Sequence, residues 1–239
     1  MPLPKIATPT YELVLPSNKK TIKYRPFLVK EEKLLVLAIE SEDTKQITTA
    51  VKNVIKSCVL TRGVKVESLP SFDIEYLFLN IRGKSVGEEV EVNITAPDDR
   101  TTQVAVTIAL DEIQVQEDEE HEKQIKLDDE LMMEMKYPSL DQFITNNFDM
   151  EGEMNVEKSF ELIASCIDKI YSQDEVWSTA DCTKKEVTEF LEQMNSLQFK
   201  QIEKFFATMP KLSHTVDIVN PKTGVESTIV LEGLSSFFA

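Results

Sequence analysis

The sequence predicts an α+β fold built from two diverged copies of one unit, each a β-hairpin followed by helices and a second β-hairpin. Near the start and the end of each half, apolar residues alternate with polar ones, which is typical of hairpin strands, and between these regions they recur at helical spacing. The run Val54–Val59 is similar to Leu162–Ile167 in the second half. Both halves share the same order of elements, which predicts an internal duplication.

The first hairpin is expected between residues 11 and 26. Residues 11–15 alternate in polarity, Pro16–Lys19 supply turn residues, and residues 22–24 resume the alternation. Pro26 cannot donate a hydrogen bond to a neighbouring strand, so it ends the second strand or marks a sheet edge.

Three helices and a second hairpin are expected next in the first half. Residues 29–40 are strong helix formers, residues 44–60 have apolar side chains at helical spacing, and a third helix begins at Pro70. Alternating segments over 90–94 and 104–110 then predict a second hairpin.

An acidic run divides the chain. Residues 116–122 read Gln-Glu-Asp-Glu-Glu-His-Glu, and such a charge run is usually solvated. We therefore expect an acidic linker over residues 116–124, with a first α+β repeat unit over 1–115 and a second over 125–239.

The second unit repeats the order of the first, with one addition. A hairpin is expected over 125–137, a helix over 139–146, and a further helix from Asn155 through Ile170. An inserted helix near 183–194 has no counterpart in the first half, and it begins with a capping-box pattern. Another helix matches the one after Pro70, and alternation between Val216 and Leu231 predicts the closing hairpin.

Charge and composition exclude several classes of partner. The net charge is −16, which would repel a phosphate backbone, so no nucleic-acid binding is expected. No 18-residue apolar run and no apolar leader is present, so neither a membrane span nor a secretory signal is expected. The three cysteines, Cys58, Cys166 and Cys182, have no metal-ligand spacing, and the first two fit buried helix positions in a reducing compartment.

A search for chemistry predicts no catalytic, cofactor-binding or metal site. Phosphate-binding, zinc-hydrolase and nucleophile-elbow patterns are missing from the sequence, and the two histidines, His121 and His214, lie in unlike contexts. Pairs such as Asp98-Asp99 and Asp128-Asp129 lie in expected turns, where Asp bonds to the local backbone. A carboxylate-dependent hydrolase is the alternative of a different class, and it would require acids that converge in one cleft.

The terminal aromatic residues Phe237 and Phe238 allow two interpretations. They could pack back onto the last helix, or they could serve as partner contacts, because aromatic side chains make good interface anchors. Both interpretations stay open at the level of sequence.

Four stretches carry a resemblance to a known family. They are Ile6–Leu13 continuing through Lys23–Glu32, Arg82–Glu88, Phe205–Leu212, and Leu231–Leu234 before Phe237-Phe238. Together they resemble the baseplate hub or hub-assembly proteins of T-even-type contractile-tailed bacteriophages. The resemblance spans most of the chain, is specific in the N-terminal block, and is looser through residues 114–160.

The resemblance implies a non-enzymatic protein that acts by protein–protein contacts in the assembly or structure of a phage tail baseplate hub. Its implied partners are other phage baseplate or hub proteins, and no cofactor is implied. It would be found in the host cytoplasm during assembly and in the virion tail baseplate, or it would be an assembly chaperone that is absent from the mature virion.

Overall fold

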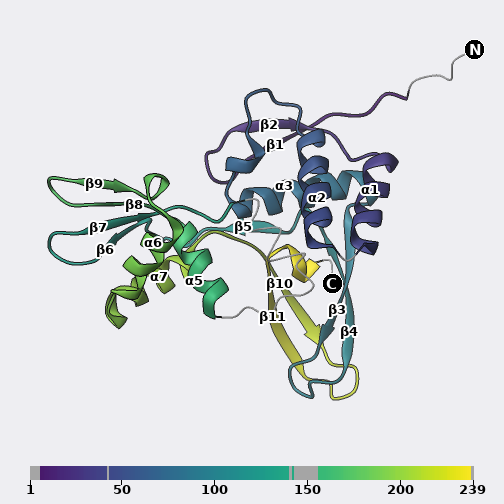
Figure 1. The fold of residues 1–239 in the computed structure, drawn as a ribbon. Helices are drawn as coiled ribbons and strands as arrows, with labels where there is room; N and C mark the ends of the chain where they lie inside the picture. The colour runs from purple at the N-terminus through teal and green to yellow at the C-terminus, as the bar shows by residue number, and fades with distance from the viewer. Residues whose placement is uncertain (1–5, 42, 140–141, 143–155, 238–239) are drawn as a thin grey trace, which may run out of the picture.

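The chain forms two lobes that lie side by side (Figure 1). A computed structural model describes residues 6–41, 43–139, 142 and 156–237. The helices are α1 (Val29–Glu40), α2 (Thr44–Cys58), α3 (Ser71–Val86), α5 (Val156–Ser165), α6 (Lys184–Glu192) and α7 (Ser196–Thr208), with short 3-10 helices at Val66–Ser68, Thr179–Asp181 and Leu234–Phe237. The strands are β1 (Tyr11–Val14), β2 (Thr21–Tyr24), β3 (Glu89–Thr95), β4 (Gln103–Ala109), β5 (Gln114–Gln116), β6 (Gln124–Lys126), β7 (Met132–Met135), β8 (Ile167–Tyr171), β9 (Val176–Ser178), β10 (Lys211–Val219) and β11 (Glu226–Glu232).

The first lobe combines the hairpin β1–β2, helices α1 to α3, and the hairpins β3–β4 and β10–β11. Its hydrophobic core draws on both ends of the chain, because Leu212, Val216, Ile218 and Phe237 join the cluster formed by residues 13–113. Strand β10 also pairs with β5, which extends the closing hairpin to three strands. The closing hairpin is therefore packed into the first lobe.

The hairpins β3–β4 and β10–β11 project together from the helices (Figure 1). Alternate residues along β3 and β10 are buried in the same cluster, as period-2 strands that share one core require. The tips are tied together by polar contacts, in which Asn220 Nδ2 donates to Asp98 at 2.9 Å and Thr223 Oγ1 donates to Asp98 at 2.6 Å.

The second lobe is an antiparallel sheet in the order β6-β7-β8-β9, packed against α5, α6 and α7. Its core residues are Ile125, Leu127, Met133, Met135, Cys166, Ile167, Val187, Leu191, Ile202 and Phe205. Polar residues alternate with these along the strands, so the helices cover the apolar face of a sheet that could not stand alone.

Aromatic contacts join the two lobes. Ser71, at the start of α3, donates its N–H to Pro138 O at 2.9 Å, and the neighbouring Phe72 ring meets Tyr137 edge-on at 5.0 Å. Tyr137 in turn stacks on His121 at 5.5 Å and on Phe205 at 5.8 Å. This cluster fixes the second lobe against the N-terminus of α3.

The mixed helix-and-strand class predicted from the sequence is confirmed, whereas the two-copy architecture is not. One local parallel does support it: Arg25 N donates to Cys58 O at 2.9 Å, and Lys136 N donates to Cys166 O at 2.7 Å. The boundaries at 1–115, 116–124 and 125–239 stay a prediction. The buried clusters group the closing hairpin with the first lobe instead of with residues 125–208.

The expected helix 139–146 falls almost entirely outside the described residues. The expected continuation of a helix through Ile170 is wrong, because α5 ends at Ser165 and residues 167–171 form β8. The residues of β8 pair with β7 on one side and β9 on the other, and those strand hydrogen bonds replace the helical ones.

Candidate functional site

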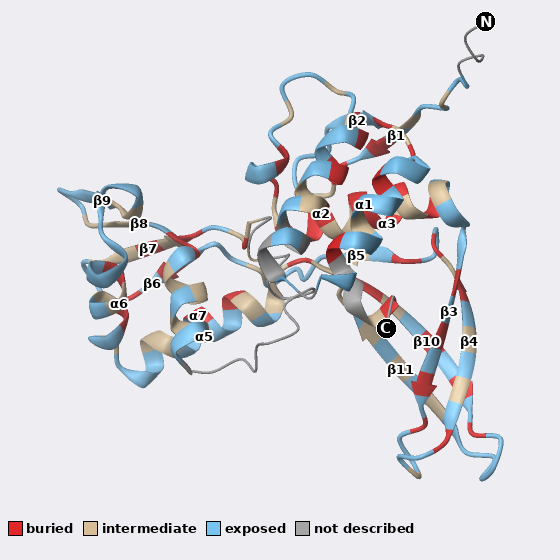
Figure 2. Ribbon diagram, turned by 45° about the vertical axis from the view of Figure 1, so that its right-hand side comes forward, coloured by how far each residue is buried: buried red, intermediate tan, exposed pale blue. Residues whose placement is uncertain are grey.

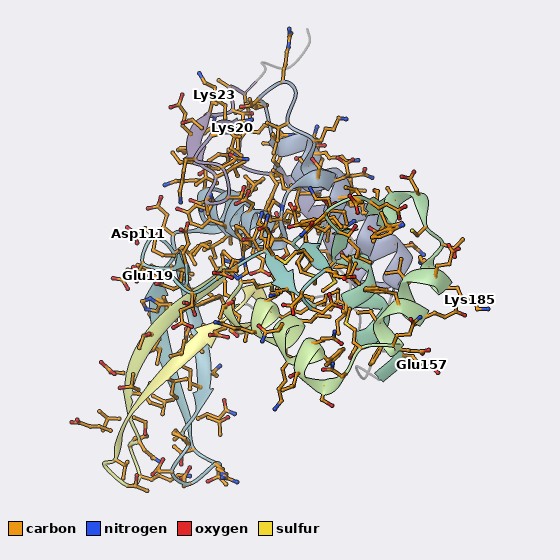
Figure 3. The ribbon with its side chains drawn as sticks, turned by 90° about the vertical axis from the view of Figure 1, so that its left-hand side faces the viewer. Lys20, Lys23, Asp111, Glu119, Glu157 and Lys185 are labelled. Atoms are coloured by element: carbon orange, nitrogen blue, oxygen red, sulfur yellow. The ribbon has the colours of Figure 1, made fainter. Side chains whose placement is uncertain are left out.

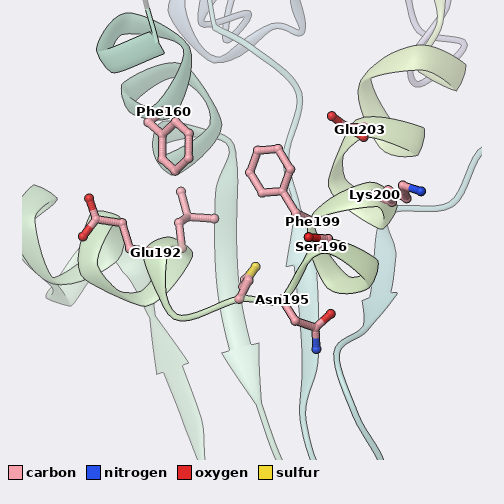
Figure 4. A pocket seen from close by; sticks show the side chains of 9 residues that line it. Phe160, Glu192, Asn195, Ser196, Phe199, Lys200 and Glu203 are labelled. Atoms are coloured by element: carbon pink, nitrogen blue, oxygen red, sulfur yellow. The ribbon is translucent and has the colours of Figure 1, made fainter.

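A groove of about 490 Å³ opens on the second lobe between α5, the α6–α7 turn and α7 (Figure 4). Its walls are apolar and are formed by Phe160, Leu191, Met194 and Phe199. The Phe160 and Phe199 rings stack on each other in this lining, at a centroid distance of 5.6 Å and an interplanar angle of 19°. An open apolar groove of this size matches the dimensions of sites that accept side chains or small ligands.

Local sequence fixes the turn that forms the floor of the groove. Asn195 caps α7, since its side-chain oxygen accepts hydrogen bonds from Leu197 N at 2.9 Å and Gln198 N at 3.0 Å. Gln198 returns the contact by accepting from Asn195 N at 2.9 Å, which completes a capping box. Gln198 also donates to Leu127 O at 2.9 Å and so ties α7 to the sheet.

The rim of the groove is polar and of mixed charge. Glu192, Lys200 and Glu203 line it together with Ser196. Leu197, next to Ser196 in the chain, is 74% exposed although it is a large apolar residue. Apolar walls with a charged rim are suited to hold a partner's side chain.

Charged side chains are exposed on the outside of both lobes. Figure 3 shows Lys20 and Lys23 pointing outward from the β1–β2 hairpin, and Glu157 and Lys185 pointing outward from α5 and α6. Across the described residues, no group of three or more His, Cys, Asp or Glu side chains is arranged to hold a metal ion. In the same part of the chain, no helix combines the length and apolar character needed to cross a bilayer.

The terminal aromatic residues are placed differently from one another. Phe237 is fully buried in the first-lobe core, so its ring is not available as a surface anchor in this conformation. Phe238 lies outside the described residues. A partner contact through this pair stays a prediction.

The cysteines differ sharply in exposure. Cys58 and Cys166 are 0% exposed, and burial raises the pKa of each thiol to about 11, so both are neutral near pH 7. Cys182 is exposed at the turn before α6. The repeated Ser-Cys run therefore marks core positions.

His121, expected within a solvated linker, is instead part of the aromatic cluster between the lobes. Its ring contacts Tyr137 and Phe205, and its Nδ1 lies 3.0 Å from Thr208 Oγ1. The buried Nε2 makes no hydrogen bond to any residue that the structure describes. Burial lowers the pKa of His121, the charge of Lys123 lowers it further, and Asp118 opposes both effects.

The sequence did not reveal the groove. Phe160 was expected on a helix face, but nothing in the spacing indicates that this face lies opposite Phe199. The capping residues Asn195 and Gln198 indicate in the sequence where α7 begins. Nothing in the sequence indicates that Leu197 is exposed.

The family model described as T4 bacteriophage base plate protein matches residues 8–239, nearly the whole chain. The chain belongs to this family. No curated protein and no solved structure matches the chain.

Membership of the T4 baseplate family agrees with the resemblance seen in the sequence. It indicates a structural role in the phage baseplate, contacts with other baseplate proteins, and a place in the virion tail. Apolar surfaces that the chain leaves uncovered are consequently the features of interest in this baseplate protein.

Proposed function

We propose that this baseplate protein acts without catalysis, by protein–protein contacts in the assembly or structure of the baseplate hub. The observation that supports the proposal is the open groove lined by Phe160 and Phe199, with the exposed Leu197 next to the lining residue Ser196 in the chain. Apolar side chains in these positions gain free energy only when another surface covers them. A further baseplate protein is the partner that the family indicates.

The groove would take an apolar anchor side chain from a neutral or basic surface of that partner. A chain with a net charge of −16 repels acidic surfaces at long range and attracts basic ones. An aromatic or leucine side chain would pack against the Phe160 and Phe199 rings from the open side of the groove, as buried anchors do at the centres of interfaces.

Filling the groove tests this proposal without removing any core side chain. Ser196 is exposed on the groove's lining, so Ser196→Phe adds a ring where the partner's anchor would sit. Ser57→Phe, at an exposed position of α2, adds the same ring on the other lobe and is the matched control.

In cells infected with phage that lack the wild-type gene, Ser57→Phe is expected to restore complete baseplates and Ser196→Phe is not. Electron microscopy of the particles reads the outcome, and thermal melts confirm that both variants fold. Normal baseplates with Ser196→Phe would show that the groove is not where the partner docks.

Two roles are open to a hub protein. As a structural component it stays in the particle, and as an assembly chaperone it leaves before maturation. Mass spectrometry of purified particles, set against the infected-cell lysate, separates them. We expect its peptides in the particles, and their absence there combined with abundance in the lysate would instead support the chaperone.

A further inference from the structure

A second uncovered apolar surface lies on α1, on the side of the first lobe that faces away from the second (Figures 1 and 2). The inner side of α1 is buried through Glu31 and Ala38 and packs against α2. On the outer side, Leu34 is 54%, Val36 48% and Leu37 51% exposed. Three large apolar side chains within four residues are more than the isolated chain would be expected to leave in water.

Charges are distributed unevenly along this outer side. Lys30 and Lys33 precede Leu34 and Leu37, and Glu40 follows them, at spacings that put all five residues on one helical stripe. We call these five residues the α1 stripe. It is basic at one end, apolar in the middle and acidic at the other end.

The order of charge on the α1 stripe does not serve the helix itself. The helix dipole favours acidic residues in the first turn and basic residues in the last, and the last turn of α1 has Glu40 and no basic residue. Lys30 pairs with Glu31 at 3.4 Å and with no other described residue, and its side chain is 70% exposed. Among the described residues, neither Lys33 nor Glu40 makes an ion pair.

An antiparallel copy of the α1 stripe complements it. With a two-fold axis between Leu34 and Leu37, Leu34 lies opposite Leu37 of the second copy, and Lys30 lies beside its Glu40. The same symmetry repeats each contact, as an isologous interface requires. The aliphatic stem of Lys33 then covers Leu37 of the second copy, as long basic side chains do over apolar surface.

The charge distribution favours contact between two copies at this surface rather than at any other face of the molecule. Residues 29–58, which span α1 and α2, contain five lysines and five carboxylates, so the whole formal charge of −16 lies elsewhere in the chain. Two such chains repel one another through their other faces and not through this one.

We propose that this protein forms a two-fold symmetric dimer through antiparallel contact of the α1 stripes. The proposal is independent of the groove and of the role in the hub, because it needs only the surface of α1. The second lobe, on the opposite side of the first, stays free in such a dimer.

Charge reversal distinguishes this dimer from any other use of the surface. Lys30→Glu alone and Glu40→Lys alone each place like charges opposite each other at both symmetry-related positions. The double variant exchanges the two charges and restores attraction. Sedimentation velocity over a range of concentrations of the full chain gives the dissociation constant, with Lys20→Glu on the β1–β2 hairpin as the control.

The wild type and Lys20→Glu are expected to dimerise alike, and each single α1 variant to dimerise about tenfold more weakly. The double variant should return to within about threefold of the wild type, and Leu34→Asp should be monomeric while retaining its thermal melt. A wild-type chain that is monomeric at every concentration would overturn the proposal. So would single variants that dimerise as well as the wild type, or a double variant no better than the singles.

Discussion

Removing the Glu31 carboxylate is expected to destabilise the first lobe strongly. Glu31 is 4% exposed, and it accepts hydrogen bonds from Arg25 Nη2 at 2.9 Å and from Leu28 N at 2.7 Å. The contact with Leu28 holds the start of α1, and the contact with Arg25 holds α1 to the end of β2. Glu31→Ala removes both contacts and leaves the Arg25 guanidinium, 15% exposed, without its counter-ion.

The expected loss of unfolding free energy is about 3 kcal/mol, because breaking a buried ion pair by removing one partner costs roughly 3–5 kcal/mol. The lower end applies because Arg25 keeps a hydrogen bond to Pro26 O at 2.9 Å. Arg25→Met combined with Glu31→Leu should recover most of the loss, since no charge is then left buried. Urea unfolding followed by circular dichroism measures each value.

An exposed ion pair provides the control for Glu31. Glu12 lies 3.4 Å from Lys23, and both side chains are 62% exposed, so Glu12→Ala should cost below about 0.5 kcal/mol. A loss of unfolding free energy in Glu31→Ala no larger than that in Glu12→Ala would show that the buried pair contributes no more than an exposed one.

The pH dependence of the Glu31 contribution has a definite sign. Burial alone would raise the pKa of Glu31, but the hydrogen bonds from Arg25 and Leu28 and the charges of Arg25 and Lys30 outweigh it, so the pKa is lowered. The stabilisation is therefore complete above the unfolded carboxyl value of about 4.3 and is lost as the pH falls through the folded value.

Two further predictions concern the junction and the thiols. Because the folded-state pKa of His121 is lowered by burial, the unfolded state takes up a proton near about pH 6.5 that the folded state does not. The free energy of unfolding should thus fall from neutral pH toward about pH 5, and His121→Phe should flatten that slope. An equal slope in His121→Phe and His214→Gln would show that His121 is not the group responsible. In the native protein, a thiol reagent at mildly alkaline pH should modify Cys182 and leave Cys58 and Cys166 unmodified until urea is added. Rapid reaction of all three thiols without urea would show that the two lobes open readily.

The hairpins could be predicted from the sequence because they depend on local patterns. Apolar and polar residues alternate in β3 and β10, and turn residues follow each strand, so a hairpin is the arrangement that fits both. The turn after β10 contains Gly224, whose left-handed backbone, with a φ of 75°, suits glycine. The start of α6 was equally visible, since Thr183 and Glu186 form the capping box that their spacing indicates.

Features that depend on distant contacts could not be predicted. Ile167 and Ile170 fit a helical spacing as well as a strand, and pairing with β7 decides between them. The same applies to the closing hairpin, whose apolar residues Val216 and Ile218 fit either lobe until the core is known. The groove depends on two helices that meet only through the fold, so Phe160 gives no sign of its role.

If this baseplate protein docks another baseplate protein at the groove of its second lobe, as we propose, a lysine on the rim of the groove should lie close to that partner. Chemical cross-linking of baseplate intermediates isolated from infected cells, read by mass spectrometry at lysines, measures this proximity. Lys200 lies on the rim of the groove, and Lys185, whose side chain is 84% exposed on α6, does not line it. We predict cross-links from Lys200 to another baseplate protein and none from Lys185 to the same partner, whereas cross-links to other proteins that avoid Lys200 would contradict the claim.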